Sequence, residues 1–315
     1  NICRAGAGSR RDLGIPAPRD AEVIHHHYDV SNEFYEMVLG PSMTYTCALF
    51  ESEDQSLEDA QENKYRLVFE KLNLKPGDRL LDIGCGWGGG MVRYAARRGV
   101  KAIGVTLSRE QAEWAQRAIV AEGLGDSAEV RFSDYRDVPP ETGFDAISSI
   151  GLTEHIGVGN YPAYFGLLHN KLREGGLLLN HCITRPRNNG KAKAGGFIDR
   201  YVFPPDGELT GSGRIITEVQ DVGFEVLHEE NLRQHYALTL KGWCEYLEAN
   251  WDACVAEVGE GTARVWGPVH GWVPARIRAQ HRSAASCSGG QTRRRPASPD
   301  PRCAPGGKPR RLRRP

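Results

Sequence analysis

Short apolar runs alternate with segments of helical periodicity through the middle of the chain. The runs lie at residues 79–83, 100–106, 129–133, 144–150 and 176–182. Apolar runs of this length predict the buried strands of a parallel sheet. The segments between them space their apolar residues three and four apart, which predicts amphipathic helices. The chain is therefore expected to fold as an α/β protein with a mostly parallel sheet.

The first core helix is expected over residues 56–72. Ser56 is suited to the N-cap, and Asp59 lies three residues later, where the helix dipole favours an acid. Its buried side is marked by Leu57, Ala60, Tyr65, Val68 and Leu72. Four further helices are expected: one that begins at about Met91, one that ends at Ala121, one over 164–172 and one around 235–243.

Three segments fall outside this alternation. Residues 1–20 are rich in Gly, Pro and Arg, and are interpreted as a linker or the remnant of an upstream region. Residues 184–213 form an irregular insertion with aromatics at 197–204, either a lid over an apolar substrate or a surface loop with a packed anchor. Residues 268–315 lose apolar periodicity, and the ordinary interpretation is a disordered basic tail. One domain is therefore expected over 21–267.

The first apolar run ends in a glycine-rich turn. Glycines let a backbone approach a ligand closely, and the helix that follows offers unpaired N–H groups. The spacing Gly84-x-Gly86-x-x-Gly89 also fits a dinucleotide-binding turn. In that fold an acid usually ends the second strand, but Thr106 stands there, which disfavours a dehydrogenase. An ordinary tight turn is the remaining alternative.

Charge is unevenly distributed along a chain that is neutral overall. Residues 268–315 hold 12 Lys and Arg and one acid, which leaves 28 basic and 39 acidic residues before them. An acidic body argues against nucleic acid as the main partner. No apolar run approaches the ~18 residues that a membrane-spanning helix needs. Without a signal peptide, and with eight Cys in no metal or disulfide spacing, the cytoplasm is the expected location.

Three adjacent histidines, residues 25–27, stand in the first helical pattern. Neighbouring positions of a helix point in different directions, so three of them cannot face one ion. No metal site is therefore expected.

Several separate motifs occur in one order along the chain. They are His26-His27-Tyr28-Asp29, Gly40-Pro41, Tyr45-Thr46-Cys47-Ala48-Leu49-Phe50, and Asp82 with Gly84-Cys85-Gly86-Trp87-Gly88. Together they resemble the cyclopropane-fatty-acyl-phospholipid synthases, which include the mycolic acid cyclopropane synthases. The resemblance covers about residues 21–267. It implies the Rossmann-like fold of the class I S-adenosylmethionine (AdoMet) methyltransferases, with extra helices covering an acyl site.

The resemblance also implies AdoMet as the cofactor, bound at the glycine turn and at the ends of the next strands. The residues that it implies for AdoMet are Tyr45, Thr46, Asp82, Gly84, Cys85, Gly86, Thr106, Leu107, Ser108, Arg109, Glu110, Gln111, Asp134 and Tyr135, the last two beside the adenine.

Sheets of this type bind ligands at the carboxyl ends of their strands, where Glu154 and His181 both fall. The resemblance implies that these two residues, with Tyr236 and the backbone of Cys47, hold a bicarbonate ion. It also implies that the ring of Tyr28 faces the reacting centre. Aromatic faces would stabilise a cation formed on the alkene, and the bicarbonate would remove a proton to close a ring. Considered singly, Glu154 could be a helix-capping acid and His181 a core histidine.

The implied function is transfer of a methylene or methyl group from AdoMet to the cis double bond of an unsaturated fatty acyl chain. The product would be a cyclopropane or a methyl-branched lipid. The implied partner is an unsaturated acyl lipid, reached by peripheral contact with the inner face of the membrane. Two alternatives stay open: a methyltransferase of the same fold that acts on a small molecule, and an inactive relative that only binds AdoMet or lipid.

The tail has a second interpretation at the level of codons. With one base removed near the Gly267 codon, residues 266–272 can be encoded to read Trp-Gly-Leu-Tyr-Met-Ala-Gly, and residues 276–281 can yield Gly-Phe-Glu-Arg-Asn. Both resemble the closing helix and strand of the family. Residues 268–315 are therefore expected to be a frameshifted end. Such an end lacks the terminal Cys of many family members, for which Cys287 and Cys303 are no substitute, so the activity of this chain is in question.

Overall fold

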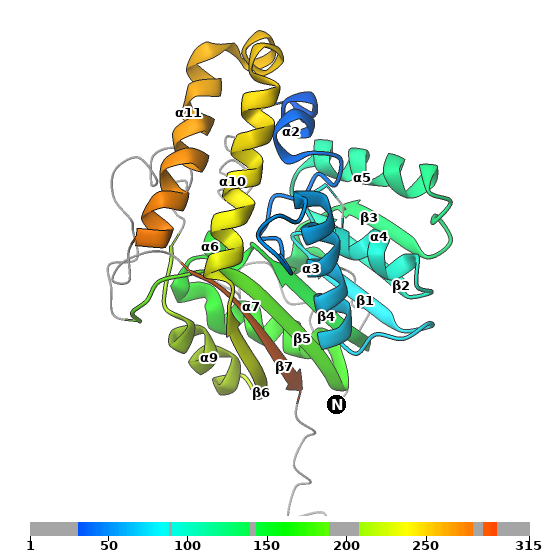
Figure 1. Cartoon of the computed structure of the whole chain (residues 1–315). Helices are drawn as coiled ribbons and strands as arrows, with labels where there is room; N and C mark the ends of the chain where they lie inside the picture. The colour runs from blue at the N-terminus through cyan, green and yellow to red at the C-terminus, as the bar shows by residue number, and fades with distance from the viewer. Residues whose placement is uncertain (1–30, 88–89, 139–142, 189–207, 280–285, 295–315) are drawn as a thin grey trace, which may run out of the picture.

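The computed structural model describes residues 31–87, 90–138, 143–188, 208–279 and 286–294. Within them one seven-stranded sheet has the order β3-β2-β1-β4-β5-β7-β6 (Figure 1). The first five strands pair in parallel, whereas β7 pairs antiparallel with both β5 and β6. The strands are β1 (Arg79–Ile83), β2 (Lys101–Thr106), β3 (Ala128–Phe132), β4 (Phe144–Ile150), β5 (Leu172–Thr184), β6 (Phe224–Asn231) and β7 (Ser286–Arg294).

Helices cover both faces of this sheet (Figure 1). Around it lie α2 (Asn32–Leu39), α3 (Leu57–Lys71), α4 (Gly90–Ala96), α5 (Arg109–Ala121), α6 (Thr153–Ile156), α7 (Tyr161–Lys171), α9 (Ser212–Asp221), α10 (Arg233–Ala249) and α11 (Trp251–Ala279). Single 3-10 turns follow β3 and α6, as η2 (Tyr135–Asp137) and η3 (Val158–Asn160).

Alternation along the strands explains why both faces are covered. Successive side chains of a strand point to opposite faces of the sheet. Leu80 packs in a core with α3, α4 and α5, whereas Leu81 packs in a second core with α7 and α9. Both side chains are fully buried. The continuous apolar runs of the sequence therefore correspond to strands buried on both sides, and the expected α/β fold with a mostly parallel sheet is confirmed.

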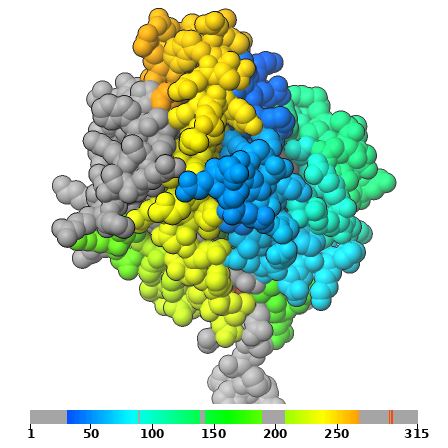
Figure 2. Space-filling model, viewed as in Figure 1, coloured from blue at the N-terminus to red at the C-terminus, as the bar shows by residue number. Residues whose placement is uncertain are grey.

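A third apolar cluster lies above the sheet. It joins α2, the first turn of α3, α10 and α11 around Phe34, Tyr35, Trp87 and Trp243. Figure 2 shows α10 (yellow) against the segment from α2 to α3 (blue), so these helices form one cover on that face of the molecule. Helix α11 is interrupted at Gly259, whose φ of 78° and ψ of 153° are not helical.

The elements agree closely with those expected from the sequence. Ser56 caps α3 by accepting the N–H of Asp59 at 3.1 Å, and β4 spans the expected residues. Strand β5 is longer at both ends than the predicted run of 176–182. The tail differs from expectation, because residues 268–279 continue α11 and residues 286–294 form β7. These two segments have regular backbone structure where a disordered tail was expected, and the remaining residues after 267 lie outside the described ranges.

No helix in the described ranges has the length and apolar character needed to cross a membrane.

Candidate active site

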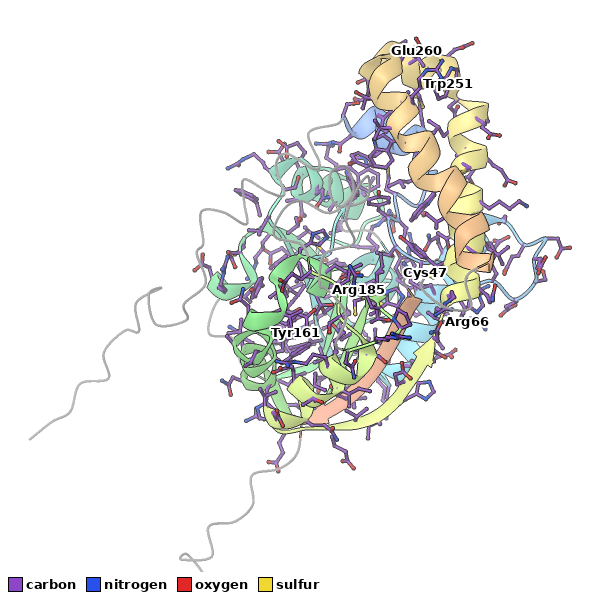
Figure 3. The ribbon with its side chains drawn as sticks, turned by 90° about the vertical axis from the view of Figure 1, so that its left-hand side faces the viewer. Cys47, Arg66, Tyr161, Arg185, Trp251 and Glu260 are labelled. Atoms are coloured by element: carbon purple, nitrogen blue, oxygen red, sulfur yellow. The ribbon has the colours of Figure 1, made fainter. Side chains whose placement is uncertain are left out.

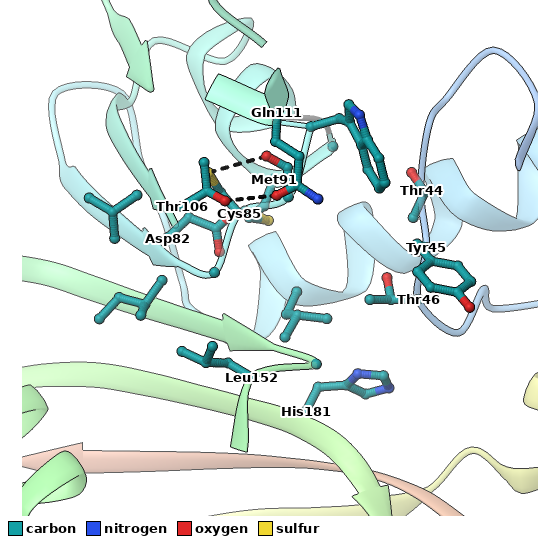
Figure 4. Close-up of a pocket in the computed structure, with 18 of the residues that line it drawn as sticks. Thr44, Tyr45, Thr46, Asp82, Cys85, Met91, Thr106, Gln111, Leu152 and His181 are labelled. Atoms are coloured by element: carbon teal, nitrogen blue, oxygen red, sulfur yellow. Dashed lines mark hydrogen bonds between the residues drawn. The ribbon is translucent and has the colours of Figure 1, made fainter. Parts of the chain in front are cut away.

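A cavity lies at the carboxyl ends of β1, β2, β4 and β5, beside α3 and the start of α10 (Figure 4). The sheet order brings these strand ends together, although the sequence separates them. The cavity is lined by most of the residues expected in the site, namely Tyr45, Thr46, Cys47, Asp82, Gly84, Cys85, Gly86, Thr106, Leu107, Gln111, Tyr135, Glu154, His181 and Tyr236. Their roles toward a ligand stay predictions.

The glycine turn is closed by backbone bonds, and its first glycine, Gly84, has little room for a side chain. Gly84 has a φ of 72°, a left-handed value that favours glycine. The N–H groups of Gly84 and Cys85 both donate to the carbonyl of Val105 at 3.0 Å. A Cβ on Gly84 would lie 3.2 Å from Cδ1 of Leu152. Glycine at this position therefore lets the turn approach the loop after β4 closely.

Asp82 carries a buried carboxyl group beneath this turn. Its Oδ1 accepts a hydrogen bond from the Ser148 hydroxyl at 2.6 Å, and the residue is 5% exposed. Burial raises the pKa of Asp82 to about 6, although the Ser148 hydrogen bond and the nearby charge of Lys64 both oppose the rise. The carboxylate form therefore predominates at neutral pH and places a negative charge at the cavity wall.

The segment after β2 combines cavity-lining residues with residues that cap α5. The Thr106 hydroxyl donates to Oε1 of Gln111 at 2.7 Å inside the cavity (Figure 4). Four expected cofactor residues, by contrast, are not among the lining residues: Ser108, Arg109, Glu110 and Asp134. Ser108 and Asp134 instead cap α5 and η2, and the Arg109 guanidinium lies over the Phe132 ring. Their contact with AdoMet stays a prediction.

The first turns of α10 hold the loop that carries Cys47. Figure 3 shows Cys47 deep between the helical cover and the sheet, and the residue is 1% exposed. The N–H of Ala48 donates to the Thr239 hydroxyl at 2.9 Å, and that of Phe50 donates to Nδ1 of His235 at 3.1 Å. The backbone beside Cys47 is therefore fixed by side chains of α10.

Glu154 and His181 meet because β4 and β5 are parallel neighbours. His181 pairs in register with Ile150, and Glu154 follows that strand in α6. Both side chains are buried, at 4% and 5% exposure. Oε1 of Glu154 accepts the N–H of Ile183 at 2.8 Å. Within the described residues, Oε2 of Glu154 and both ring nitrogens of His181 have no hydrogen-bond partner.

Three buried polar atoms without partners at one cavity wall fit a small polar ligand, because such atoms are otherwise costly to bury. Burial raises the pKa of Glu154, opposed by the Ile183 hydrogen bond and by His181. A carboxyl group that retains its proton can donate a hydrogen bond to an anion. The chemistry of this donor set therefore fits the bicarbonate ion that the family resemblance implies, and its binding here stays a prediction.

Tyr236 lines the same cavity from α10, and its ring packs edge-on against Trp243 with centroids 6.4 Å apart. Tyr28, the three histidines and the proposed lid at 197–204 lie outside the described residues. In the part of the chain that is described, no group of three or more His, Cys, Asp or Glu side chains could hold a metal ion.

Sequence reasoning missed several lining residues, among them Lys64, Tyr65, Ser133 and His155. Lys64 had a detectable signal. Gln61 and Lys64 follow Leu57 by four and seven positions, and so stand on the apolar face of the predicted helix. Both are buried in the structure, at 1% and 3% exposure. A polar residue on the buried face of an amphipathic helix is a candidate for a functional site.

Comparison with known proteins gives matches over most of the chain. The family model described as mycolic acid cyclopropane synthetase matches residues 17–269. A Mycobacterium tuberculosis protein named "probable fatty acid methyltransferase" is 74% identical over 79% of this chain and 58% of its own length. A Pseudomonas putida protein of the same name is 45% identical over 78% of this chain and 63% of its own length. The chain thus spans less than two thirds of these relatives.

A solved structure is similar over nearly the same region. The mycolic acid cyclopropane synthase CmaA1, complexed with SAH and CTAB, superposes with a TM-score of 0.79 and 30% identity. The match covers 89% of this chain and 99% of that one. The fold described above is therefore that of a solved cyclopropane synthase.

Proposed function

The chain belongs to the mycolic acid cyclopropane synthetase family, and from this premise we propose that it modifies the cis double bond of an unsaturated acyl lipid with a one-carbon group from AdoMet. The product would be a cyclopropane where the cation loses a proton, or a methyl branch where a reductant supplies a hydride to the cation. The observation that carries the proposal is the buried pair of Glu154 and His181, with unpartnered polar atoms at the wall of the cavity that the glycine turn also lines.

AdoMet would bind along the carboxyl ends of β1, β2 and β3. The glycine turn permits close approach of a ligand to the backbone, and Thr106 and Gln111 offer polar atoms beside it. Tyr135, which follows β3, offers a buried ring for the adenine. When bound, AdoMet supplies a methyl group on a positively charged sulfur, which is a very good leaving group. The solved structure of CmaA1 is a complex with SAH, which supports this ligand class.

The Glu154 side of the cavity would hold the proton acceptor. Bound there, a bicarbonate ion would supply a base for the proton released on ring closure. Glu154 and His181 would orient that ion through the three atoms that have no partner within the described residues. Burial raises the pKa of Glu154, which favours its protonated form and so reduces its repulsion of an anion. Tyr236 would contribute its hydroxyl and an aromatic face near the cation on the acyl chain.

The substrate is expected to be an unsaturated phospholipid or another acyl lipid of the cytoplasmic membrane face, reached by peripheral contact. The test is incubation of the protein with methyl-labelled AdoMet and vesicles of mixed unsaturated phospholipids. Mass analysis should show acyl chains heavier by one CH2 group for ring closure. Label in a small molecule but not in lipid would favour the small-molecule methyltransferase instead. AdoMet binding without any labelled product would indicate an inactive relative.

The role of Glu154 has its own test. Glu154→Gln should lower turnover by roughly 100-fold or more, because positioned acid–base groups contribute about that much, while AdoMet affinity stays within a few-fold of wild type. Glu218→Gln is the matched control, since Glu218 is also buried, at 5% exposure, but lies on α9 and does not line the cavity. Wild-type turnover should also fall in bicarbonate-depleted buffer. Full turnover in the Glu154 variant would contradict this mechanism.

A further inference from the structure

A buried lysine lines the cavity beside the glycine turn. Lys64 lies on α3, is 3% exposed, and contributes to the cavity wall. Its ammonium donates to the Thr46 hydroxyl at 2.8 Å and lies 4.0 Å from the centroid of the Tyr65 ring. A buried ammonium at the wall of a cavity is well placed to meet an anionic group of a ligand, because low exposure to water strengthens the attraction between opposite charges.

The opposite charge stands across the same cavity. Asp82 is buried at the end of β1, and the charge of Lys64 acts on its carboxyl group. The Thr46 hydroxyl accepts the hydrogen bond of the Lys64 ammonium. Thr46 and Asp82 face the cavity from opposite sides (Figure 4). One ligand lying between α3 and β1 would therefore meet a cation on one side and a carboxyl group on the other.

This arrangement matches one end of AdoMet. The methionine part of AdoMet carries a carboxylate and an ammonium on the same carbon. The sheet order β3-β2-β1 places Tyr135, which follows β3, two strand spacings or roughly 10 Å from β1. A ligand with its adenine near Tyr135 would thus extend its amino-acid end toward β1 and α3.

On these grounds we infer that Lys64 binds the carboxylate of AdoMet and selects for ligands that carry it, with Asp82 facing the ammonium. Thr46 and Gln61 are the supporting residues. The Thr46 hydroxyl accepts one hydrogen of the Lys64 ammonium, and Nε2 of Gln61 donates to the Thr46 carbonyl at 2.9 Å. Helix α3 therefore fixes both Lys64 and the loop that it contacts. The inference rests on AdoMet being the methyl donor of the proposed function.

The test compares two ligands that differ only in the carboxylate, AdoMet and decarboxylated AdoMet. Wild-type protein should bind AdoMet roughly 10- to 100-fold more tightly by calorimetry, the range for a charge-assisted hydrogen bond in a buried site. Lys64→Met should lose most of this ratio by weakening AdoMet alone. Lys64→Arg keeps the charge and should keep part of the ratio. Lys71→Met removes a lysine from the same helix, outside the cavity, and should keep all of it.

Each result tests either the role of Lys64 in AdoMet binding or the proposed modification of lipid. Equal affinity of wild-type protein for the two ligands overturns the role of Lys64, even if the Lys64 variants fail to fold. An unchanged ratio in folded Lys64→Met overturns it as well, because a purely structural lysine would affect both ligands alike. Wild-type protein that shows the ratio but modifies no lipid would keep this inference and refute the proposed reaction.

Discussion

The carboxyl group of Asp82 links the ionisation of the site to the stability of the fold. Burial raises its pKa from 3.8 to about 6, so the folded protein holds this proton more tightly than the unfolded chain does. The protonated Asp82 carboxyl group therefore makes its full favourable contribution to the free energy of unfolding below about pH 4. This contribution is lost as pH rises through 6, because the folded state must then bury a carboxylate.

Asp82→Asn should remove this pH dependence. A shift of about two pKa units corresponds to about 3 kcal/mol, so the stability of wild type relative to the variant should fall by up to that amount between pH 4 and pH 7.5. Urea unfolding at both pH values measures the difference. Asp126→Asn, at an exposed position, is the control and should run parallel to wild type. A parallel result for Asp82→Asn would show that its carboxyl group does not titrate differently on folding.

Gly84 tests the placement of AdoMet at the same turn. Gly84→Val adds a side chain at a φ of 72° and 3.2 Å from Leu152, so the turn must move or fill the ligand space. AdoMet affinity should fall at least tenfold by calorimetry. Gly123→Val is the control for backbone strain, since Gly123 has a φ of 69° and open space around its Cβ. Undiminished AdoMet binding in folded Gly84→Val would place the ligand elsewhere.

At the scale of elements, α10 connects the helical cover to the loop that carries Cys47. Thr239 is fully buried, accepts the Ala48 N–H and donates to the His235 carbonyl at 2.7 Å. His235 in turn accepts the Phe50 N–H. Two turns of α10 therefore determine the backbone beside Cys47, and a change in their side chains should reach the site without a change in any lining residue.

Thr239→Val keeps the shape of the side chain but removes the hydroxyl. The buried Ala48 N–H would lose its acceptor, which costs about 1–3 kcal/mol of stability. We expect lipid-modifying turnover to fall by about tenfold, because the loop is no longer fixed. Thr217→Val is the matched control, since the Thr217 hydroxyl donates to a carbonyl of its own helix, α9, away from the cavity. Equal turnover of Thr239→Val and wild type would limit Thr239 to a structural role.

The sequence predicts elements well where local signals and burial agree, as at β4 and at the Ser56 cap of α3. Strand β5 extends to Leu172, past its two glycines, because Leu172 pairs with Phe144 of β4 across an irregularity in the register. The residues of the cavity were predictable through a family resemblance rather than through spacing. Lys64 was missed although it stands on the apolar face of α3, because a lysine there can also bury its aliphatic stem and keep its ammonium in water.

At the scale of the whole molecule, β7 is the described strand whose sequence agrees least with its position in the sheet. It occupies an interior position of the sheet, between β5 and β6. Interior strands normally consist of apolar and β-branched residues. The sequence of β7 is Ser-Cys-Ser-Gly-Gly-Gln-Thr-Arg-Arg, whose adjacent glycines weaken a strand. The match to the family model ends at residue 269, before this strand. Position and sequence therefore conflict at β7, as a shifted reading frame near Gly267 would produce.

A frame-corrected end should stabilise the protein. Replacing the polar β7 by an apolar strand would bury on the order of 200 Å2 more apolar surface, worth about 5 kcal/mol. For a domain of this size that corresponds to a melting temperature higher by about 10–20 °C. We would compare three chains in thermal scans: the present chain, the frame-corrected chain, and one that ends at Gly267. The first and third should melt at similar temperatures, because the present β7 contributes little, and both should melt below the second.

Resequencing the gene around the Gly267 codon tests the frame directly. A confirmed frame, together with cooperative melting of the present chain well above the shortened one, would refute this explanation of the tail.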